Sequence, residues 1–100
     1  MIDKIIKAEY NLTAIPEYKF HDKRKWRFDY AILSHMVAIE IEGGVWMKKA
    51  RHTSPKGFIA DMEKYNTATV MGWKVIRIVP NDYASLIRYL DEILKTSRIE

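Results

Sequence analysis

Two short segments in which apolar and polar residues alternate constrain the fold of this chain more than any other feature of its sequence. Residues 26–32 place Phe28, Tyr30 and Ile32 on one side, and residues 37–42 alternate in the same way. A period of two is typical of β-strands that bury one face. Because the two segments are so close in the chain, they predict a β-hairpin.

A turn at Ser34-His35 would pair Ala31 with Ala38 and Asp29 with Glu40 across this hairpin. Side chains directly opposite each other have Cβ atoms about 4.5–5.5 Å apart, and like charges in such a pair are destabilising. Two opposed carboxylates therefore predict a cation between them, and hard divalent cations such as Mg²⁺ take carboxylate oxygens. The alternative, a solvent-exposed acidic face, is less consistent with the helices predicted on either side of the hairpin. Repulsion alone further predicts that removing either carboxylate leaves the metal-free protein no less stable.

The other elements follow from the spacing of apolar residues. Residues 18–20 predict an edge strand, residues 73–79 predict a further strand, and Pro80-Asn81-Asp82 offers a cap for a last helix. Three stripes at helical spacing predict helices: Ile2, Ile5, Ile6 and Tyr10; Phe58, Met62, Tyr65 and Thr69; Leu86, Leu90, Ile93 and Leu94. The order of helix, three strands, helix, strand and helix predicts an α/β fold with a small mixed central β-sheet flanked by helices.

The composition is that of one ordinary globular domain, which we expect to span residues 1–100. Of the 100 residues, 48% are hydrophobic and 30% are charged, close to the globular average. The lack of cysteine excludes a disulfide scaffold, a zinc ribbon and a thiol nucleophile. No apolar run is long enough to span a membrane or to form a signal peptide, and we expect a cytoplasmic protein.

The net charge is +4, and the positive charge is concentrated in two segments. Residues 17–27 hold five basic residues against two acidic ones, and residues 45–57 hold four basic residues and no acid. This concentration is expected of a surface that contacts phosphate groups, although a solvated face is the alternative. The candidate DNA-binding residues are Lys23, Arg24, Lys25, Arg27, Lys48, Lys49, Arg51 and Lys56.

Asp29, followed on the next strand by Glu40-Ile41-Glu42, resembles the acidic motif of the PD-(D/E)XK nuclease superfamily. A longer string is similar to small phage and prophage endonucleases of that superfamily, and its parts are residues 24–31, 38–46, 51–52, 57–58, 61, 63–66 and 72–73. The likeness covers most of the chain, from about residue 17 to residue 80. It implies a restriction-endonuclease-like core of helix, three strands, helix and strand.

Matched position by position, the metal-binding residues of this superfamily fall on Asp29 and Glu40. The third position, usually a lysine, is Glu42 here, as in some restriction endonucleases of this class. The missing lysine could instead come from the following helix, where Lys64 is the candidate. The alternative interpretation of Lys64 is a surface lysine paired with Asp61.

Glu9 matches an acid in the first helix that some junction resolvases of this class use, and we expect it to be a further metal ligand. It falls within the apolar stripe of Ile2, Ile5 and Ile6, where a surface acid would not be expected. A small change in the rotation of the helix would instead place Glu9 in solvent.

The resemblance implies metal-assisted hydrolysis of phosphodiester bonds. Mg²⁺, for which Mn²⁺ would substitute, would be held by Asp29 and Glu40 and would lower the pKa of a water that it binds. Glu42 would act as the general base, and Lys64 or a basic loop residue would steady the scissile phosphate. His52 is a second candidate to act on the water or the leaving group, or else a phosphate contact.

We therefore expect a structure-selective DNA endonuclease in a bacterium or a phage-infected host. A Holliday-junction resolvase of DNA recombination or repair, acting as a homodimer, is the best example of this class. A chain of 100 residues leaves little room for a separate specificity domain, which argues against recognition of a long sequence. The alternative is a DNA-binding module of the same fold that lost cleavage together with the usual lysine.

Overall fold

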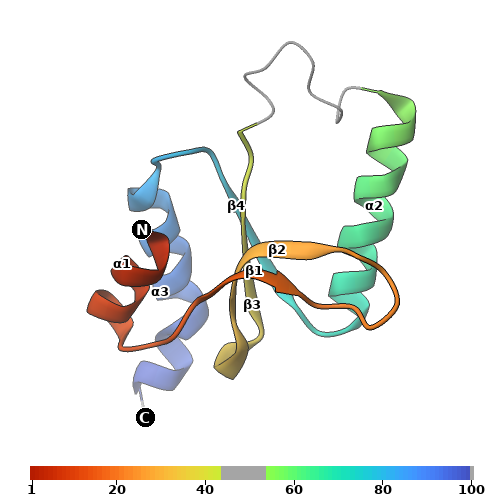
Figure 1. Ribbon diagram of the computed structural model, residues 1–100. Coiled ribbons are helices and arrows are strands. Elements are labelled where there is room, and N and C mark those ends of the chain that lie inside the picture. Colours follow the sequence, from red (N-terminus) through yellow and green to blue (C-terminus); the bar gives the residue numbers. More distant parts are fainter. Residues whose placement is uncertain (44–53, 100) are drawn as a thin grey trace.

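An antiparallel hairpin lies at the centre of this fold, in a computed structural model that describes residues 1–43 and 54–99 and the side chains up to residue 95 (Figure 1). Strand β2 spans Arg27–Ile32, strand β3 spans Val37–Ile41, and a 3-10 turn at Leu33–His35 joins them. Ala31 pairs with Ala38, which confirms the predicted register.

Two further strands extend the hairpin into a mixed sheet of four. Strand β1 spans Ile15–Lys19, strand β4 spans Lys74–Ile78, and the strands lie in the order β1-β2-β3-β4. The pairs β1–β2 and β2–β3 are antiparallel, whereas β3 and β4 are parallel. Parallel neighbours need a long crossover, and helix α2 supplies it here. The predicted edge strand is confirmed, although it begins at Ile15, three residues earlier than the alternation indicated.

Helices cover both faces of the sheet (Figure 1). Helix α1 (Ile2–Tyr10) and helix α3 (Tyr83–Ile99) lie on one face, and α2 (Pro55–Val70) lies on the other. Two buried clusters result, one on each face. The first includes Ile2, Ile6, Ile32, Ile39, Leu86 and Leu90, and the second is formed by Phe20, Phe28, Ala31, Ala38, Ala68 and Trp73. The observed order of elements confirms the α/β fold with a mixed central sheet.

The buried face of α2 is not the one that its apolar residues predicted. Phe58 and Met62 remain 51% and 56% exposed, and Thr69 is also exposed. Tyr65 does face the sheet as the stripe predicted, together with Lys64 and the fully buried Ala68. The prediction is wrong for Phe58, Met62 and Thr69, because the second half of the helix packs Lys64 and Tyr65 against the buried Glu40 of β3, and that contact requires polar partners.

The cap predicted before the last helix is confirmed, and local signals also mark the two ends of α2. Asp82 accepts a hydrogen bond from the Ser85 N–H at 3.2 Å and so caps α3, while Gly72 ends the α2 connection with a φ of 97°. At the other end of α2, the Ser54 hydroxyl oxygen accepts from the Gly57 N–H at 2.9 Å. None of the helices in the described part of the chain is long and apolar enough to cross a membrane.

Candidate active site

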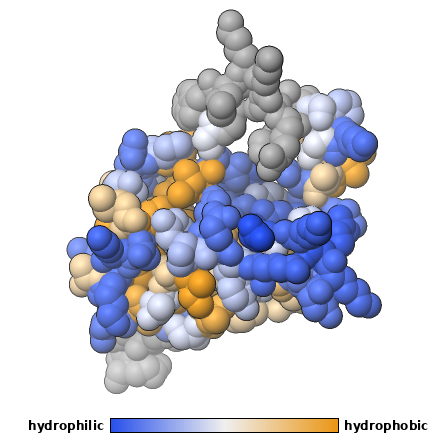
Figure 2. All heavy atoms as spheres, in the orientation of Figure 1, coloured by the Kyte–Doolittle hydropathy of each residue, from blue (hydrophilic) through white to orange (hydrophobic). Residues whose placement is uncertain are grey.

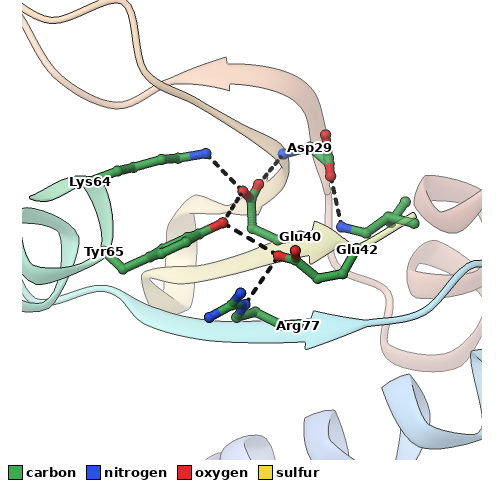
Figure 3. A network of polar contacts seen from close by, with 7 residues as sticks. Asp29, Glu40, Glu42, Lys64, Tyr65 and Arg77 are labelled. Atoms are coloured by element: carbon green, nitrogen blue, oxygen red, sulfur yellow. Dashed lines mark hydrogen bonds and ion pairs between the residues drawn. The ribbon is translucent and has the colours of Figure 1, made fainter. Parts of the chain in front are cut away.

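The carboxylates of Asp29 and Glu40 each accept a backbone N–H of the opposite strand, at the point where regular strand pairing ends (Figure 3). The Asp29 N–H donates to Glu40 Oε2 at 2.8 Å, and the Ile41 N–H donates to Asp29 Oδ2 at 2.7 Å. Each carboxylate therefore takes the place of a backbone acceptor on the opposite strand. These two hydrogen bonds hold the two acids beside each other, as the register predicted, and each carboxylate is oriented by a backbone N–H.

Glu40 is buried, so the alternative of a solvent-exposed acidic face is wrong for this residue. Its Oε1 accepts hydrogen bonds from Lys64 Nζ at 2.7 Å and from the Tyr65 hydroxyl at 2.8 Å. With the Asp29 N–H on Oε2, the carboxylate has three donors. A buried charge requires such compensation, and the Lys64 ammonium supplies the opposite charge.

Lys64 is consequently not a surface lysine, and the interpretation that paired it with Asp61 is wrong. Helix α2 presents Lys64 and Tyr65 together toward β3, because neighbouring positions of a helix can both flank the face that packs (Figure 3). Lys64 thus reaches the carboxylate of Glu40 from the helix that follows β3.

Glu42 lies just beyond β3, where its N–H donates to the Ile78 carbonyl at 2.7 Å and continues the parallel pairing. Its Oε2 accepts from Arg77 Nε at 3.0 Å, and the Tyr65 hydroxyl lies 3.4 Å from the same oxygen. Burial first, and then the negative charge of Glu40, raise the pKa of Tyr65 well above its ordinary value. The hydroxyl therefore keeps its proton and acts as a donor.

Arg77 and Tyr65 are site residues that the sequence did not single out. Arg77 is the β4 residue opposite Glu40 in the parallel pair, so its side chain shares the face of the acids. Alternation along β4 places it there, but only the strand order shows that β4 lies beside β3. Tyr65 directly follows the candidate Lys64 in the sequence, which could have indicated a place in the site, but its aromatic ring suggested a core position.

Asp29, Glu40, Glu42, Lys64 and Tyr65 line a pocket of about 610 Å³ between the sheet and α2. The pocket brings together charges of both signs. The acidic residues in its wall are Glu17, Asp29, Glu40, Glu42 and Asp61, and the basic ones are Lys25, Arg27 and Lys64. Such a lining offers carboxylate oxygens to a cation and ammonium or guanidinium groups to a phosphate in the same space.

Glu17 reaches this pocket through an unusual backbone conformation. It lies in β1 between Pro16, which pairs with Tyr30, and Tyr18, which pairs with Phe28, so it is opposite Asp29. Its φ is 52°, a left-handed value that is costly for a residue with a side chain. No local pattern in the sequence predicts this conformation.

Glu9 does not belong to the site. It is exposed, so its predicted place in the buried stripe of α1 is wrong. Helix α1 also packs on the face of the sheet opposite α2, and Glu9 is not among the residues that line the pocket (Figure 1). Ile2 and Ile6 define the buried side of α1, and Glu9 follows Ile6 by three residues but lies in the last turn of the helix, where its side chain is exposed.

Some of the candidate DNA-binding residues lie in the part of the chain that the structure describes, and others lie outside it. Lys23, Lys25 and Arg27 are exposed around the β1–β2 loop, and Lys56 is exposed at the start of α2. Hydrophilic residues gather on this side of the molecule (Figure 2). Four candidates lie outside the described residues, namely Lys48, Lys49, Arg51 and His52.

Arg24 has a different role from its basic neighbours. Its Nη1 lies 2.8 Å from Glu63 Oε2 on α2, and its guanidinium lies 4.0 Å from the centre of the Trp26 ring. The hydrogen bond with Arg24 lowers the pKa of Glu63. This contact joins the β1–β2 loop to α2 beside the pocket, and it leaves Arg24 less available to a phosphate than Lys25 or Arg27.

Comparison of the chain with protein-family models, curated proteins and solved structures found no match. The fold and the pocket define the molecule as an α/β protein whose pocket combines acidic and basic side chains around the buried Glu40.

Proposed function

We propose that this protein is a metal-dependent endonuclease that hydrolyses phosphodiester bonds in DNA. The observation that carries the proposal is the meeting of Asp29 and Glu40 across the hairpin in a pocket that also receives Lys64. Carboxylates beside a lysine suit a reaction in which a cation and a phosphate must occupy neighbouring positions.

The donor set fits Mg²⁺ or Mn²⁺. Within residues 1–43 and 54–99, no three acidic or histidine side chains cluster closely enough to hold a metal by themselves. Mg²⁺ commonly uses one or two protein carboxylates and completes its shell with water and substrate phosphate. Asp29 Oδ2 is used by the Ile41 N–H, whereas its Oδ1 accepts no hydrogen bond from the described residues. Asp29 and Glu40 would hold the ion, which when bound would polarise water and neutralise charge on the phosphate.

The remaining side chains have separate tasks in this proposal. Glu42 accepts a proton from the attacking water, because its carboxylate lies in the same pocket and is held by Arg77. Lys64 contacts the scissile phosphate when a bound cation, in place of the Lys64 ammonium, compensates the charge of Glu40. Lys25 and Arg27 hold the DNA backbone at the exposed side of the pocket.

Selectivity for branched DNA, and action as a homodimer in recombination or repair, are the finer parts of the proposal. They rest on the resemblance to small phage and prophage endonucleases. A second candidate function is DNA binding without cleavage. It is favoured by one observation, namely that Lys64, Tyr65 and the Asp29 N–H already satisfy the carboxylate of Glu40.

A cleavage assay with junction, flap, mismatch and duplex substrates tests the proposal. The wild-type protein and Asp29→Asn are compared in Mg²⁺, in Mn²⁺ and in EDTA. Asn keeps an oxygen that can accept from the Ile41 N–H, so this variant should fold normally and lose cleavage. Cutting in both metals by the wild type alone supports the nuclease, whereas binding without cutting supports the second candidate. Equal cutting by both proteins would show that Asp29 is misassigned.

A further inference from the structure

The hydroxyl of Tyr65 lies between the two carboxylates to which the proposed reaction assigns different tasks (Figure 3). It is 2.8 Å from Oε1 of Glu40 and 3.4 Å from Oε2 of Glu42. Both distances end on the same phenolic oxygen, so this single atom connects the proposed metal ligand to the proposed general base.

A phenol has one hydrogen, and it can be donated fully to only one carboxylate at a time. The shorter distance indicates that Glu40 receives it, while Glu42 remains at the edge of hydrogen-bond range. A cation that withdrew electron density from Glu40 would weaken that acceptor, and Glu42 is the next acceptor within reach of the hydroxyl.

The ring of Tyr65 is itself held in place by cations. The Arg77 guanidinium lies 4.7 Å from its centre, and the Lys64 ammonium lies 5.2 Å from it. A rigid ring between two such groups directs its hydroxyl along one line, unlike the flexible chains of lysine or glutamate. Tyr65 therefore provides a fixed point between two flexible carboxylates.

Among the described residues, the Tyr65 hydroxyl is the group that contacts Glu42 on the side of Glu40. Arg77, the ion-pair partner of Glu42, has a side chain that is 53% exposed, so that contact restrains Glu42 from the side nearer to solvent. Without the Tyr65 hydroxyl, the Glu42 carboxylate would be free to move toward Arg77 and away from Glu40.

We propose that Tyr65 is a positioning residue whose hydroxyl sets the place of the Glu42 carboxylate relative to Glu40. The inference rests on the proposed nuclease function and adds to it a residue that touches neither metal nor phosphate. A misplacement of about 1 Å at a reacting group can reduce the rate by about 10²-fold. Loss of the hydroxyl should therefore lower kcat by about that factor and leave KM for DNA unchanged.

The test measures kcat and KM for Tyr65→Phe, Glu42→Gln and the double variant, with Tyr89→Phe as the matched control. Tyr89 is exposed on α3, on the other face of the sheet, so this control loses a hydroxyl that does not line the pocket. If Tyr65 acts through Glu42, Tyr65→Phe should lower kcat in the wild-type background and add little in the Glu42→Gln background.

An unchanged kcat in Tyr65→Phe, or an equal loss in both backgrounds, would overturn the inference while leaving the nuclease proposal intact. A wild-type protein that cuts no substrate in either metal would instead remove the nuclease proposal, and the role assigned to Tyr65 with it. Should Tyr65→Phe not fold, Tyr65→Gln and Tyr65→Leu replace it, because only glutamine can donate a hydrogen bond. Equal kcat values for those two variants would also overturn the inference.

Discussion

The ammonium of Lys64 lies 2.7 Å from Oε1 of Glu40, and the two side chains are only 16% and 8% exposed. A helix and a strand that are distant in the sequence thus contribute the two halves of one buried ion pair. Its positive half lies beside one of the two opposed carboxylates of the hairpin, that of Glu40. Removal of one partner from a buried pair is destabilising because the other charge remains uncompensated.

We expect Glu40→Gln to lower the free energy of unfolding by about 1–3 kcal/mol, because it leaves the Lys64 ammonium partly buried without its counter-charge. Repulsion between Asp29 and Glu40 alone would predict no loss, and the ion pair reverses that expectation. Lys64→Met in the Glu40→Gln background should recover part of the loss. Urea denaturation of the wild type, both single variants and the double variant measures the coupling. Additive effects of the two changes would contradict an energetic link between these side chains.

Glu42→Gln should reduce the rate of DNA cleavage more than Lys64→Ala does. Loss of a general base typically costs about 10²–10⁴ in rate, whereas Lys64 is expected to assist through charge and position. Both side chains line the pocket, so the comparison does not depend on access. Single-turnover cleavage at saturating Mg²⁺ provides the measurement. If Lys64→Ala proves the more damaging change, the relocated lysine carries the role assigned here to Glu42.

Lys25→Gln combined with Arg27→Gln should weaken DNA binding and flatten its dependence on salt. Each phosphate contact that is lost should reduce the slope of log K against log salt by about 0.9 on duplex DNA. The matched control is Lys4→Gln with Lys7→Gln, which removes the same charge from the exposed side of α1 on the opposite face. Titrations at several salt concentrations give both slopes. Equal slopes of log K against log salt for the two double variants would mean that Lys25 and Arg27 contact no phosphate.

Asp82→Ala should destabilise the protein at neutral pH, and the effect should vanish in acid. Hydrogen bonds from Ser85 hold the pKa of Asp82 below its ordinary value of 3.8. A depressed pKa in the folded state stabilises the fold above the unfolded value, and this contribution is lost as the pH falls through the folded value. Denaturation midpoints between about pH 7 and pH 3 measure the trend, with the exposed Asp22→Ala as control. A difference from the wild type that stayed constant with pH would argue against the cap.

Short-range patterns in the sequence were sufficient for the hairpin and the ends of the helices. The alternation in residues 26–32 and 37–42, with a short turn between them, leaves one register that buries both apolar faces. The pairing of Ala31 with Ala38 and the proximity of Asp29 to Glu40 follow from that register alone. The cap at Asp82 and the left-handed Gly72 are equally local, because they depend on a few consecutive residues.

The rotation of α2, by contrast, was decided by tertiary structure, whereas the predicted stripes of α1 and α3 are the faces that these helices bury. Apolar residues predicted that Phe58 and Met62 face the sheet, but α2 turns Lys64 and Tyr65 toward β3 instead. A stripe of apolar residues identifies the buried side of a helix only where the opposing surface is itself apolar. Glu40 makes that surface acidic at this point, so compensation of a buried charge outweighs burial of Phe58 and Met62.

What the sequence by itself determined is therefore the acidic centre of the site: Asp29 and Glu40 on adjacent strands, with Glu42 following. Only the tertiary structure decided which cationic side chains surround this acidic centre and which predicted residues lie outside the site. Lys64, Arg77 and the hydroxyl of Tyr65 come from α2 and β4, whose approach to β3 depends on strand order and helix docking. Local spacing specifies which side chains share a face of one element, whereas contacts between elements arise from the packing of the whole chain.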